Sequence, residues 1–322
     1  MKIDIITGLL GAGKTTFIKR YVRHLVDKEQ NVCILVNDYG AISVDMALLN
    51  HELGDIADLE MVTAGDFDCY LRRTKTKLIQ MAMLGYDRIV VEPSGVFDAD
   101  DFYDILHEEP LDRWYEIGNV ISLVEADLPE HLPEDQEYLL MAQAVTAGKI
   151  VISKMKDNQD PAALKERLVS HLNRESGHFR CERQFKTSDI LAFDWDKETE
   201  EDVKAIDSAG YVRYDMSKRH IEEEGDFETL FYYTVKKSLP EVEQMVEQLF
   251  SQEKYGDVIR VKGLFQDTKT GKWYEINSTS TERNLHELDT KKEVMLVIGE
   301  RLNHEEVNKA FGETRNVLDY DV

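Results

Sequence analysis

Positive charge is scarce in this sequence of 322 residues. Lysine and arginine number 39 against 63 aspartates and glutamates, which gives a formal net charge of −24. A field this negative repels phosphate backbones and anionic lipid headgroups. The composition therefore argues against a protein whose main partner is a nucleic acid or a membrane surface.

Long apolar runs and cysteines are scarce as well. No stretch of the sequence approaches the ~18 consecutive apolar residues that a membrane-spanning helix needs. The three cysteines, Cys33, Cys69 and Cys181, lie far apart and are odd in number, so they do not form the disulfide framework of a small secreted domain. The first residues lack a small-residue cleavage site after an apolar stretch, so we expect no signal peptide. These absences predict a soluble, cytoplasmic protein.

Short apolar runs alternate with helical patterns through the first half of the chain. The runs lie at residues 3–7, 31–36, 88–92, 120–124 and 149–152, and the helical patterns at 71–84, 135–147 and 161–172. Unbroken apolar strands that alternate with helices are typical of a mostly parallel sheet with helices on both faces. The sequence therefore predicts an α/β fold.

The composition changes near residue 194. Between Asp194 and Asp226 there are twelve acids and five lysines or arginines, with Gly210 and Gly225 as breakers. A solvated charged linker accounts for this stretch better than a metal-loading patch does. Beyond it, strands are predicted at 229–235, 258–265, 272–276 and 293–298, and helices at 239–250 and 304–311. We therefore predict a first domain over 1–207, an acidic linker over 208–226 and a smaller α+β domain over 227–322.

Residues 8–15, GLLGAGKT, fit the phosphate-binding pattern G-x-x-x-x-G-K-S/T between a predicted strand and a predicted helix. Glycines allow the backbone to curl until several N–H groups point at one phosphate, and the following helix adds its N-terminal dipole. Lys14 would reach the β- and γ-phosphates, and the Thr15 hydroxyl would ligate Mg²⁺. A full match in this context argues against a coincidental glycine-rich turn. The predicted nucleotide contacts are Gly8, Gly11, Ala12, Gly13, Lys14, Thr15 and Thr16.

Three later segments resemble the CobW-type GTPases, metallochaperone relatives of the urease and hydrogenase nickel-insertion GTPases. Residues 36–40 (VNDYG), followed by Asp45, resemble the switch segment E-N-E-F-G…D of that family. Residues 91–95 (VEPSG) are similar to its E-T-S-G motif. Residues 258–265, Trp273 and residues 295–300 are similar to the C-terminal CobW domain. The resemblance covers nearly the whole chain, from Ile3 to about Phe311.

This resemblance implies roles for residues of the switch segment and of the E-T-S-G strand. Asp38 would meet Mg²⁺ and the γ-phosphate, and Glu92 would hold metal-bound water or orient the attacking water. Gly95 would bring a backbone N–H to the γ-phosphate. The predicted catalytic residues are Lys14, Asp38 and Glu92, and the predicted Mg²⁺ ligands are Thr15, Asp38 and Glu92. Taken alone, Asp38 also fits an ordinary turn, and Glu92 also fits a helix cap or a structural ion pair.

The metal motif of the family, G-C-x-C-C, is altered in this chain. The corresponding residues 65–69 read GDFDC, so aspartates replace two of the three cysteines. Thiolates suit borderline and soft ions, whereas carboxylates suit harder ones. Asp66, Asp68 and Cys69 could hold a transition metal as cargo, or the loop could have lost metal binding and kept only its switch geometry.

The base-recognition motif of the family, N-K-x-D, is altered too. Residues 153–157 read SKMKD, with Lys154 at the base-stacking position. Ser153 replaces the asparagine, Lys156 occupies the aspartate position, and Asp157 follows one residue late. Because buried hydrogen bonds carry most of such specificity, their loss would weaken discrimination between GTP and ATP. We favour GTP, with Ser153, Lys154 and Asp157 at the base, and ATP stays open.

The sequence as a whole predicts a slow P-loop NTPase that works as a switch. By family analogy it would deliver a metal or act in a corrinoid-linked process, with an unknown client protein as partner. An alternative is a nucleotide-gated assembly or activation factor that handles no metal beyond Mg²⁺. A small-molecule kinase or synthetase would share the P-loop, but the sequence shows no separate acceptor-site motif.

Overall fold

The computed structural model describes residues 1–39, 44–64, 67–93, 99–195, 197–214, 216–217, 227–280, 282–288, 290 and 293–312. The chain divides into two compact units. The first comprises Met1–Ala41 and Glu52–His220, and the second comprises Ile42–His51 and Ile221–Val322. No helix in the described part of the chain combines the length and the apolar character that crossing a bilayer requires.

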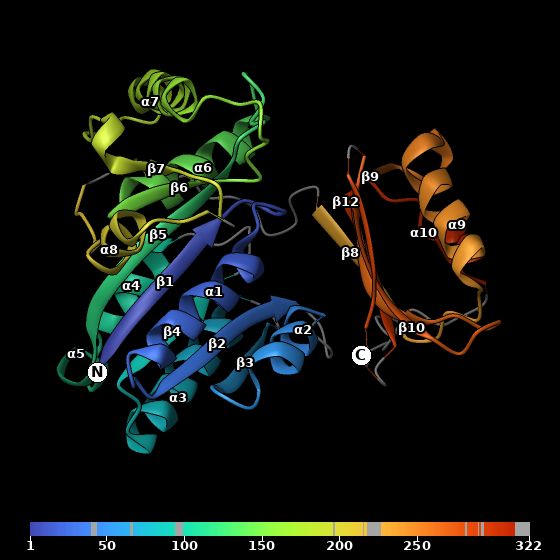
Figure 1. Cartoon of the computed structure of the whole chain (residues 1–322), viewed down its shortest axis with the longest axis horizontal. Coiled ribbons are helices and arrows are strands. Elements are labelled where there is room, and N and C mark those ends of the chain that lie inside the picture. The colour runs from blue at the N-terminus through green and yellow to red at the C-terminus, as the bar shows by residue number, and fades with distance from the viewer. Residues whose placement is uncertain are drawn as a thin grey trace. The chain divides into compact units, whose positions relative to one another are not determined.

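The first unit is built on a parallel sheet of seven strands in the order β3-β2-β4-β1-β5-β6-β7. Its strands are β1 (Lys2–Gly8), β2 (Val32–Tyr39), β3 (Asp58–Ala64), β4 (Arg88–Glu92), β5 (Glu116–Glu125), β6 (Lys149–Ser153) and β7 (Ile190–Ala192). Strand β1 lies at the centre of this sheet (Figure 1). Because all seven strands run parallel, their carboxyl ends, and the loops that follow them, share one edge.

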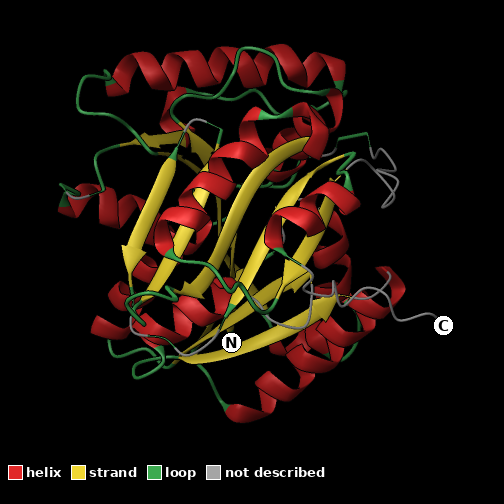
Figure 2. Cartoon of the chain, turned by 90° about the vertical axis from the view of Figure 1, so that its right-hand side faces the viewer, coloured by secondary structure: helices red, strands yellow, loops and turns green. Residues whose placement is uncertain are grey.

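Helices cover both faces of this sheet, as the sequence predicts (Figures 1 and 2). Helices α1 and α8 lie on one face, and α3, α4 and α6 lie on the other. The helices of the unit are α1 (Lys14–Asp27), α3 (Phe67–Leu84), α4 (Ala99–His107), α5 (Leu111–Trp114), α6 (Glu134–Val145), α7 (Pro161–His178) and α8 (Glu200–Asp207). The predicted α/β class is confirmed.

Several elements were not predicted from the sequence. These are α2 (Val44–Leu53), β3, α4, α5, β7 and α8. Helix α8 occupies part of the acidic stretch that begins at residue 194, so that part is not a solvated linker. The Thr199 side chain accepts a hydrogen bond from the backbone N–H of Asp202, and the Asp202 carboxylate accepts one from the N–H of Thr199. Ile206 of this helix is buried, which anchors it to the unit.

A buried polar network fixes the central strand. The Asp4 carboxylate is fully buried and accepts hydrogen bonds from the Tyr21 hydroxyl (2.8 Å), an Arg88 guanidinium N–H (2.6 Å) and the backbone N–H of Asn119 (2.7 Å). Burial, together with the neighbouring Asp4 charge, raises the pKa of the Tyr21 phenol. Because the charge of Asp4 is fully compensated, the network can hold β1 against α1, β4 and β5 without an unpaired ion. Strand β1 thereby enters the loop after Gly8 from a fixed position.

The second unit contains an antiparallel sheet of five strands in the order β11-β10-β9-β12-β8. Its strands are β8 (Phe227–Tyr232), β9 (Asp257–Gln266), β10 (Trp273–Thr279), β11 (Arg283–Glu287) and β12 (Val294–Glu300), with helices α9 (Leu239–Ser251) and α10 (His304–Phe311). The predicted α+β order holds except for β11, whose mostly exposed side chains give no apolar run. Both helices lie on one face of the sheet (Figure 1). On that face Tyr232 stacks on Phe311, with 3.8 Å between ring centroids. On the other face, Leu48 packs with Phe231, Leu264 and Leu296.

Candidate nucleotide site

The loop between β1 and α1 needs glycine for two separate reasons. A Cβ atom on Gly8 would lie 2.7 Å from the carbonyl oxygen of Leu123 in the neighbouring strand, so a side chain there would collide with backbone. Gly13 has a φ of +89° at the residue that caps the start of α1, a left-handed conformation that other residues adopt at a cost. The glycines of the predicted phosphate-binding pattern therefore shape a tight turn at the carboxyl end of the central strand.

The Lys14 ammonium lies over this loop. It is buried and donates hydrogen bonds to the carbonyl oxygens of Gly8 (2.9 Å) and Leu9 (3.2 Å). The side chain therefore folds back over the turn instead of extending into solvent. A cation held at the N-terminus of α1 adds to the positive end of the helix dipole, which makes the loop a site for an anion.

The Thr15 hydroxyl donates a hydrogen bond of 2.8 Å to the Glu92 carboxylate. Thr15 is the second residue of α1, and Glu92 is the last residue of β4, the strand next to β1, where it is buried. Hydroxyl and carboxylate oxygens are the ligands that Mg²⁺ takes from proteins beside nucleotide phosphates. The pair therefore fits the two Mg²⁺ ligands predicted at these positions.

The structure describes the remaining switch residues only in part. Asp38 belongs to the end of β2, where it pairs in register with Thr63 of β3, and Val36 pairs with Glu92 of β4. The ends of β2 and β4 thus flank each other on one side of the phosphate loop. The side chain of Asp38 lies outside the described residues, as do Gly95 and the side chain of Asp45. Their roles stay predictions.

The predicted cargo-metal residues also fall largely outside the described part. Asp66 lies outside it, and of Asp68 and Cys69 only the backbone, in the first turn of α3, is described. Among the residues that are described, no group of three or more histidines, cysteines or carboxylates is placed to hold a metal ion. A cargo site at residues 66–69 stays a prediction.

The three residues predicted to contact the base, at the end of β6 and in the loop after it, make contacts with different partners. Ser153 is buried and donates to the carbonyl oxygen of Val124 at 3.4 Å, while Lys154, with a φ of +54°, places its ammonium 3.0 Å from the Glu125 carboxylate. The Lys156 ammonium, at the position of the family aspartate, lies 2.6 Å from Asp127. Its hydrogen bond holds the pKa of Asp127 below the usual value. The Asp157 side chain is 93% exposed and pairs with Lys197 at 3.4 Å.

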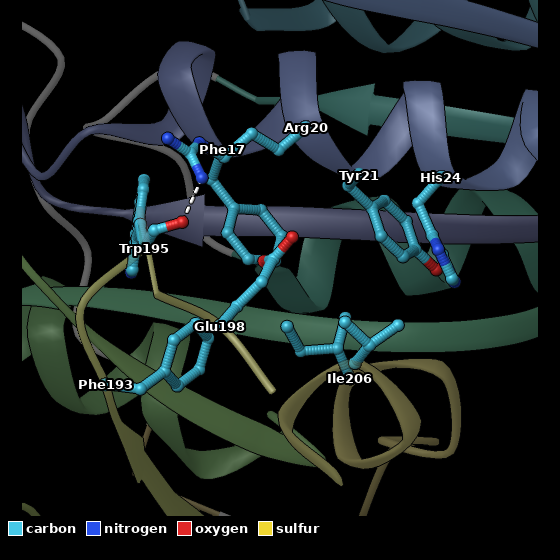
Figure 3. Close-up of a pocket in the computed structure, with 9 residues that line it drawn as sticks. Phe17, Arg20, Tyr21, His24, Phe193, Trp195, Glu198 and Ile206 are labelled. Carbon is cyan, nitrogen blue, oxygen red and sulfur yellow. Dashed lines mark hydrogen bonds between the residues drawn. The ribbon is translucent and has the colours of Figure 1, made fainter. Parts of the chain in front are cut away.

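One residue at this edge of the sheet was not predicted. Trp195 follows β7, and a Cβ atom on Gly13 would lie 3.8 Å from its indole ring and 3.8 Å from Ser153. Figure 3 shows it opposite Phe17 and Arg20 of α1, in a pocket that Phe193 also lines. Trp195 was not predicted because the acidic residues around it indicated a linker. Strand β7, which precedes it, has three residues, and so short an apolar run does not indicate a strand. The aromatic pair Phe193 and Trp195 was the available signal.

A comparison with known families decides the identity. The family described as CobW/HypB/UreG, nucleotide-binding domain, matches residues 2–185, more than half of the chain. The chain belongs to the CobW/HypB/UreG family. The matched range contains the phosphate loop, the Thr15–Glu92 pair and the altered loop at residues 153–157. Family membership confirms the resemblance drawn from the sequence motifs, and the first unit has the P-loop GTPase fold.

Two curated relatives in Escherichia coli (strain K12) are similar to this member of the family, each over about half of its length. The zinc chaperone YjiA is 27% identical over 184 residues, which cover 52% of this chain and 53% of YjiA. The zinc chaperone YeiR is 24% identical over 165 residues, which cover 50% of this chain and 48% of YeiR. The chain thus spans about half the length of the curated relatives it matches.

Solved structures of related GTPases align with the chain at low identity. The Zn(II)-bound YjiA GTPase from E. coli aligns over 98% of this chain and 99% of its own, with 16% identity and a TM-score of 0.39. The hydrogenase maturation factor HypB from Archaeoglobus fulgidus aligns over 61% of this chain and 82% of its own, with 14% identity and a TM-score of 0.38. Because both TM-scores are below 0.5, membership of the CobW/HypB/UreG family rests on the sequence match.

Proposed function

We propose that this chain binds a nucleoside triphosphate with Mg²⁺, hydrolyses it slowly and acts as a switch in the delivery of a metal or a corrinoid-linked cofactor to a client protein. GTP is the favoured nucleotide. The observation that carries the proposal is the convergence of Lys14, Thr15 and Glu92 at one edge of the sheet in a CobW/HypB/UreG chain. Two relatives named zinc chaperones support metal delivery as the process.

The chemistry of this site rests on positioning and on charge neutralisation. Phosphoryl transfer to water needs little covalent help from the protein, so preorganised cations and N–H groups supply most of the stabilisation. The Lys14 ammonium turns from the carbonyls of the loop to the β- and γ-phosphate oxygens. Thr15 and Glu92 would supply oxygen ligands to Mg²⁺, which would screen the phosphate charge. Glu92, at the buried end of β4, orients the water, and Asp38 completes the site from the switch segment.

Competition between GTP and ATP at equal Mg²⁺ tests this proposal. We expect both nucleotides to displace a fluorescent GTP analogue, GTP at the lower concentration, and we expect slow release of phosphate that requires Mg²⁺. Binding of ATP alone would overturn the GTP assignment. Failure of both nucleotides to bind would overturn the proposed function as a whole.

The altered loop at residues 65–69 carries the cargo part of the proposal. We expect the double substitution Asp66→Ala and Cys69→Ala to lower the affinity for a cargo ion about tenfold or more, because each lost ligand removes a charged or soft donor. Affinity for GTP should change less than twofold, since these residues are not proposed nucleotide contacts. Equilibrium dialysis with Zn²⁺, Co²⁺, Ni²⁺ and Mn²⁺, with and without GTP, measures the first quantity. Loss of GTP binding in the variant would place the loop in the nucleotide site instead.

The loop at residues 65–69 also supports a second candidate function. Aspartates replace two cysteines of the family motif, which suits a nucleotide-gated assembly or activation factor that carries no cargo metal. The dialysis experiment separates the two. Binding of every ion below one equivalent, independent of nucleotide, would support the factor without cargo and overturn the metal-delivery proposal.

A further inference from the structure

The two ends of a bound triphosphate can be assigned to opposite sides of the sheet edge. The Thr15–Glu92 pair lies toward β4 and β2, the strands on one side of β1, and this pair marks the end that holds Mg²⁺ and the γ-phosphate. Strands β5, β6 and β7 lie on the other side of β1. A nucleotide whose phosphates follow the loop from Lys14 therefore directs its base toward the ends of β6 and β7. This step rests on the proposed function.

Trp195 lies where the base would arrive. Its indole ring and Ser153 are both in van der Waals range of a Cβ built on Gly13, so three loops meet at one point: the phosphate loop, the loop after β6 and the loop after β7. Lys197, two residues further on, ties the last two loops together through ion pairs with Asp157 (3.4 Å) and Asp194 (2.7 Å). The indole thus borders the phosphate site on its β6–β7 side.

The position of Trp195 is fixed from helix α1. An Arg20 guanidinium N–H donates to the carbonyl oxygen of Trp195, as the dashed line in Figure 3 marks. The Phe17 ring meets the indole edge-on, with 5.6 Å between centroids and 64° between planes. Both anchors belong to the first two turns of the helix that begins at Lys14. A ring held in this way is preorganised, so it loses little conformational entropy when a ligand contacts it.

The indole N–H of Trp195 is buried, and no hydrogen-bond acceptor for it lies among the residues that the structure describes. A buried donor without an acceptor is costly in a folded protein and is uncommon. The nucleoside part of a nucleotide brings acceptors on its ribose and its base. The aromatic face meanwhile suits any purine, because stacking needs only a π-face and reads no hydrogen-bond code.

We propose that Trp195 is a nucleobase-contacting residue of this site and that it binds purines by stacking. It compensates for the altered loop at 153–157, in which Lys156 is engaged by Asp127 and Asp157 is exposed. Because stacking does not distinguish guanine from adenine, Trp195 contributes equally to the binding of GTP and ATP. The preference between the two nucleotides comes from other groups.

Three ligands test this assignment: Mg–GTP, Mg–ATP and inorganic tripolyphosphate, which has the phosphates without a base. Trp195→Ala is expected to weaken both nucleotides by about tenfold, the range found for removal of a stacking aromatic side chain. Binding of tripolyphosphate and the ratio of GTP to ATP affinity should stay unchanged. Trp195→Phe, which keeps a ring, should bind both nucleotides within about threefold of the wild type. Phe193→Ala, a substitution in the same loop, is the matched control and should bind like the wild type.

Fluorescence gives an independent readout because the chain has only three tryptophans. In a variant with Trp114→Phe and Trp273→Phe, the emission of Trp195 should be quenched by GTP and by ATP and left unchanged by tripolyphosphate. The assignment is overturned if Trp195→Ala binds GTP like the wild type, if Trp195→Phe is as weak as Trp195→Ala, or if tripolyphosphate binding falls equally. A wild-type chain that binds no nucleotide contradicts the proposed function itself, and the assignment with it.

Discussion

Lys14→Ala is expected to abolish binding of nucleoside triphosphates at concentrations that saturate the wild type. The buried ammonium donates two hydrogen bonds to the carbonyls of the phosphate loop. In the proposed site it would exchange them for hydrogen bonds to charged phosphate oxygens. Hydrogen bonds to charged groups contribute about 1.5–3 kcal/mol each, so the loss of two corresponds to roughly a hundredfold or more in affinity. Isothermal titration with Mg–GTP and Mg–ATP measures this loss.

Lys28→Ala is the matched control for Lys14→Ala. Lys28 follows the last residue of the same helix, its side chain is 47% exposed, and it pairs with Asp207. The substitution makes the same change in net charge without touching the loop, so nucleotide affinity should stay within about twofold because exposed ion pairs contribute little. Thermal unfolding of both variants checks that they are folded. A folded Lys14→Ala protein with wild-type affinity would show that residues 8–15 do not bind phosphate.

The part of the fold around the phosphate loop could be predicted because its residues leave few alternatives. Gly13 is required by its left-handed φ, a constraint local enough for a sequence pattern to carry. Gly8, whose Cβ would meet the carbonyl oxygen of Leu123 in the neighbouring strand, is the first residue of the same pattern. The buried strands β1, β4 and β6 could be predicted because both of their faces are covered, so their sequences are continuous apolar runs. Strand β11 has mostly exposed side chains and gave no such run.

The base side of the site could be predicted only in part because its geometry depends on contacts between distant residues. The partner of Lys156 is Asp127, and the residues that hold Trp195 are Arg20 and Phe17, up to 178 positions earlier in the chain. No local pattern encodes such pairs. The capping box at Thr199 was readable in the sequence, yet the density of acids around it favoured a linker. Local sequence rules therefore sufficed to predict the phosphate loop. The residues on the base side could be identified only from the folded structure.

Glu92→Gln is expected to slow hydrolysis by on the order of a hundredfold or more while leaving nucleotide affinity within about threefold, as befits a residue that positions a proton-accepting or metal-bound water. Glutamine keeps the volume of the side chain and can still accept the hydrogen bond from Thr15, so the buried end of β4 stays filled. It lacks the negative charge that would hold Mg²⁺ and its water in the proposed site. The Mg²⁺ concentration for half-maximal rate should therefore rise together with the fall in rate.

A second glutamate in the same sheet, two strands away from Glu92, distinguishes this role from a general effect of charge. Glu60 of β3 pairs with Lys77 at 2.9 Å, and its side chain is 35% exposed. Glu60→Gln removes one negative charge from the same sheet, and because the pair is partly solvated we expect wild-type hydrolysis and an unchanged Mg²⁺ requirement. Phosphate release under single-turnover conditions, measured over a Mg²⁺ series, compares the two variants. Equal rates for Glu92→Gln and the wild type would assign Glu92 to a structural contact with Thr15 and leave the orientation of water to Asp38.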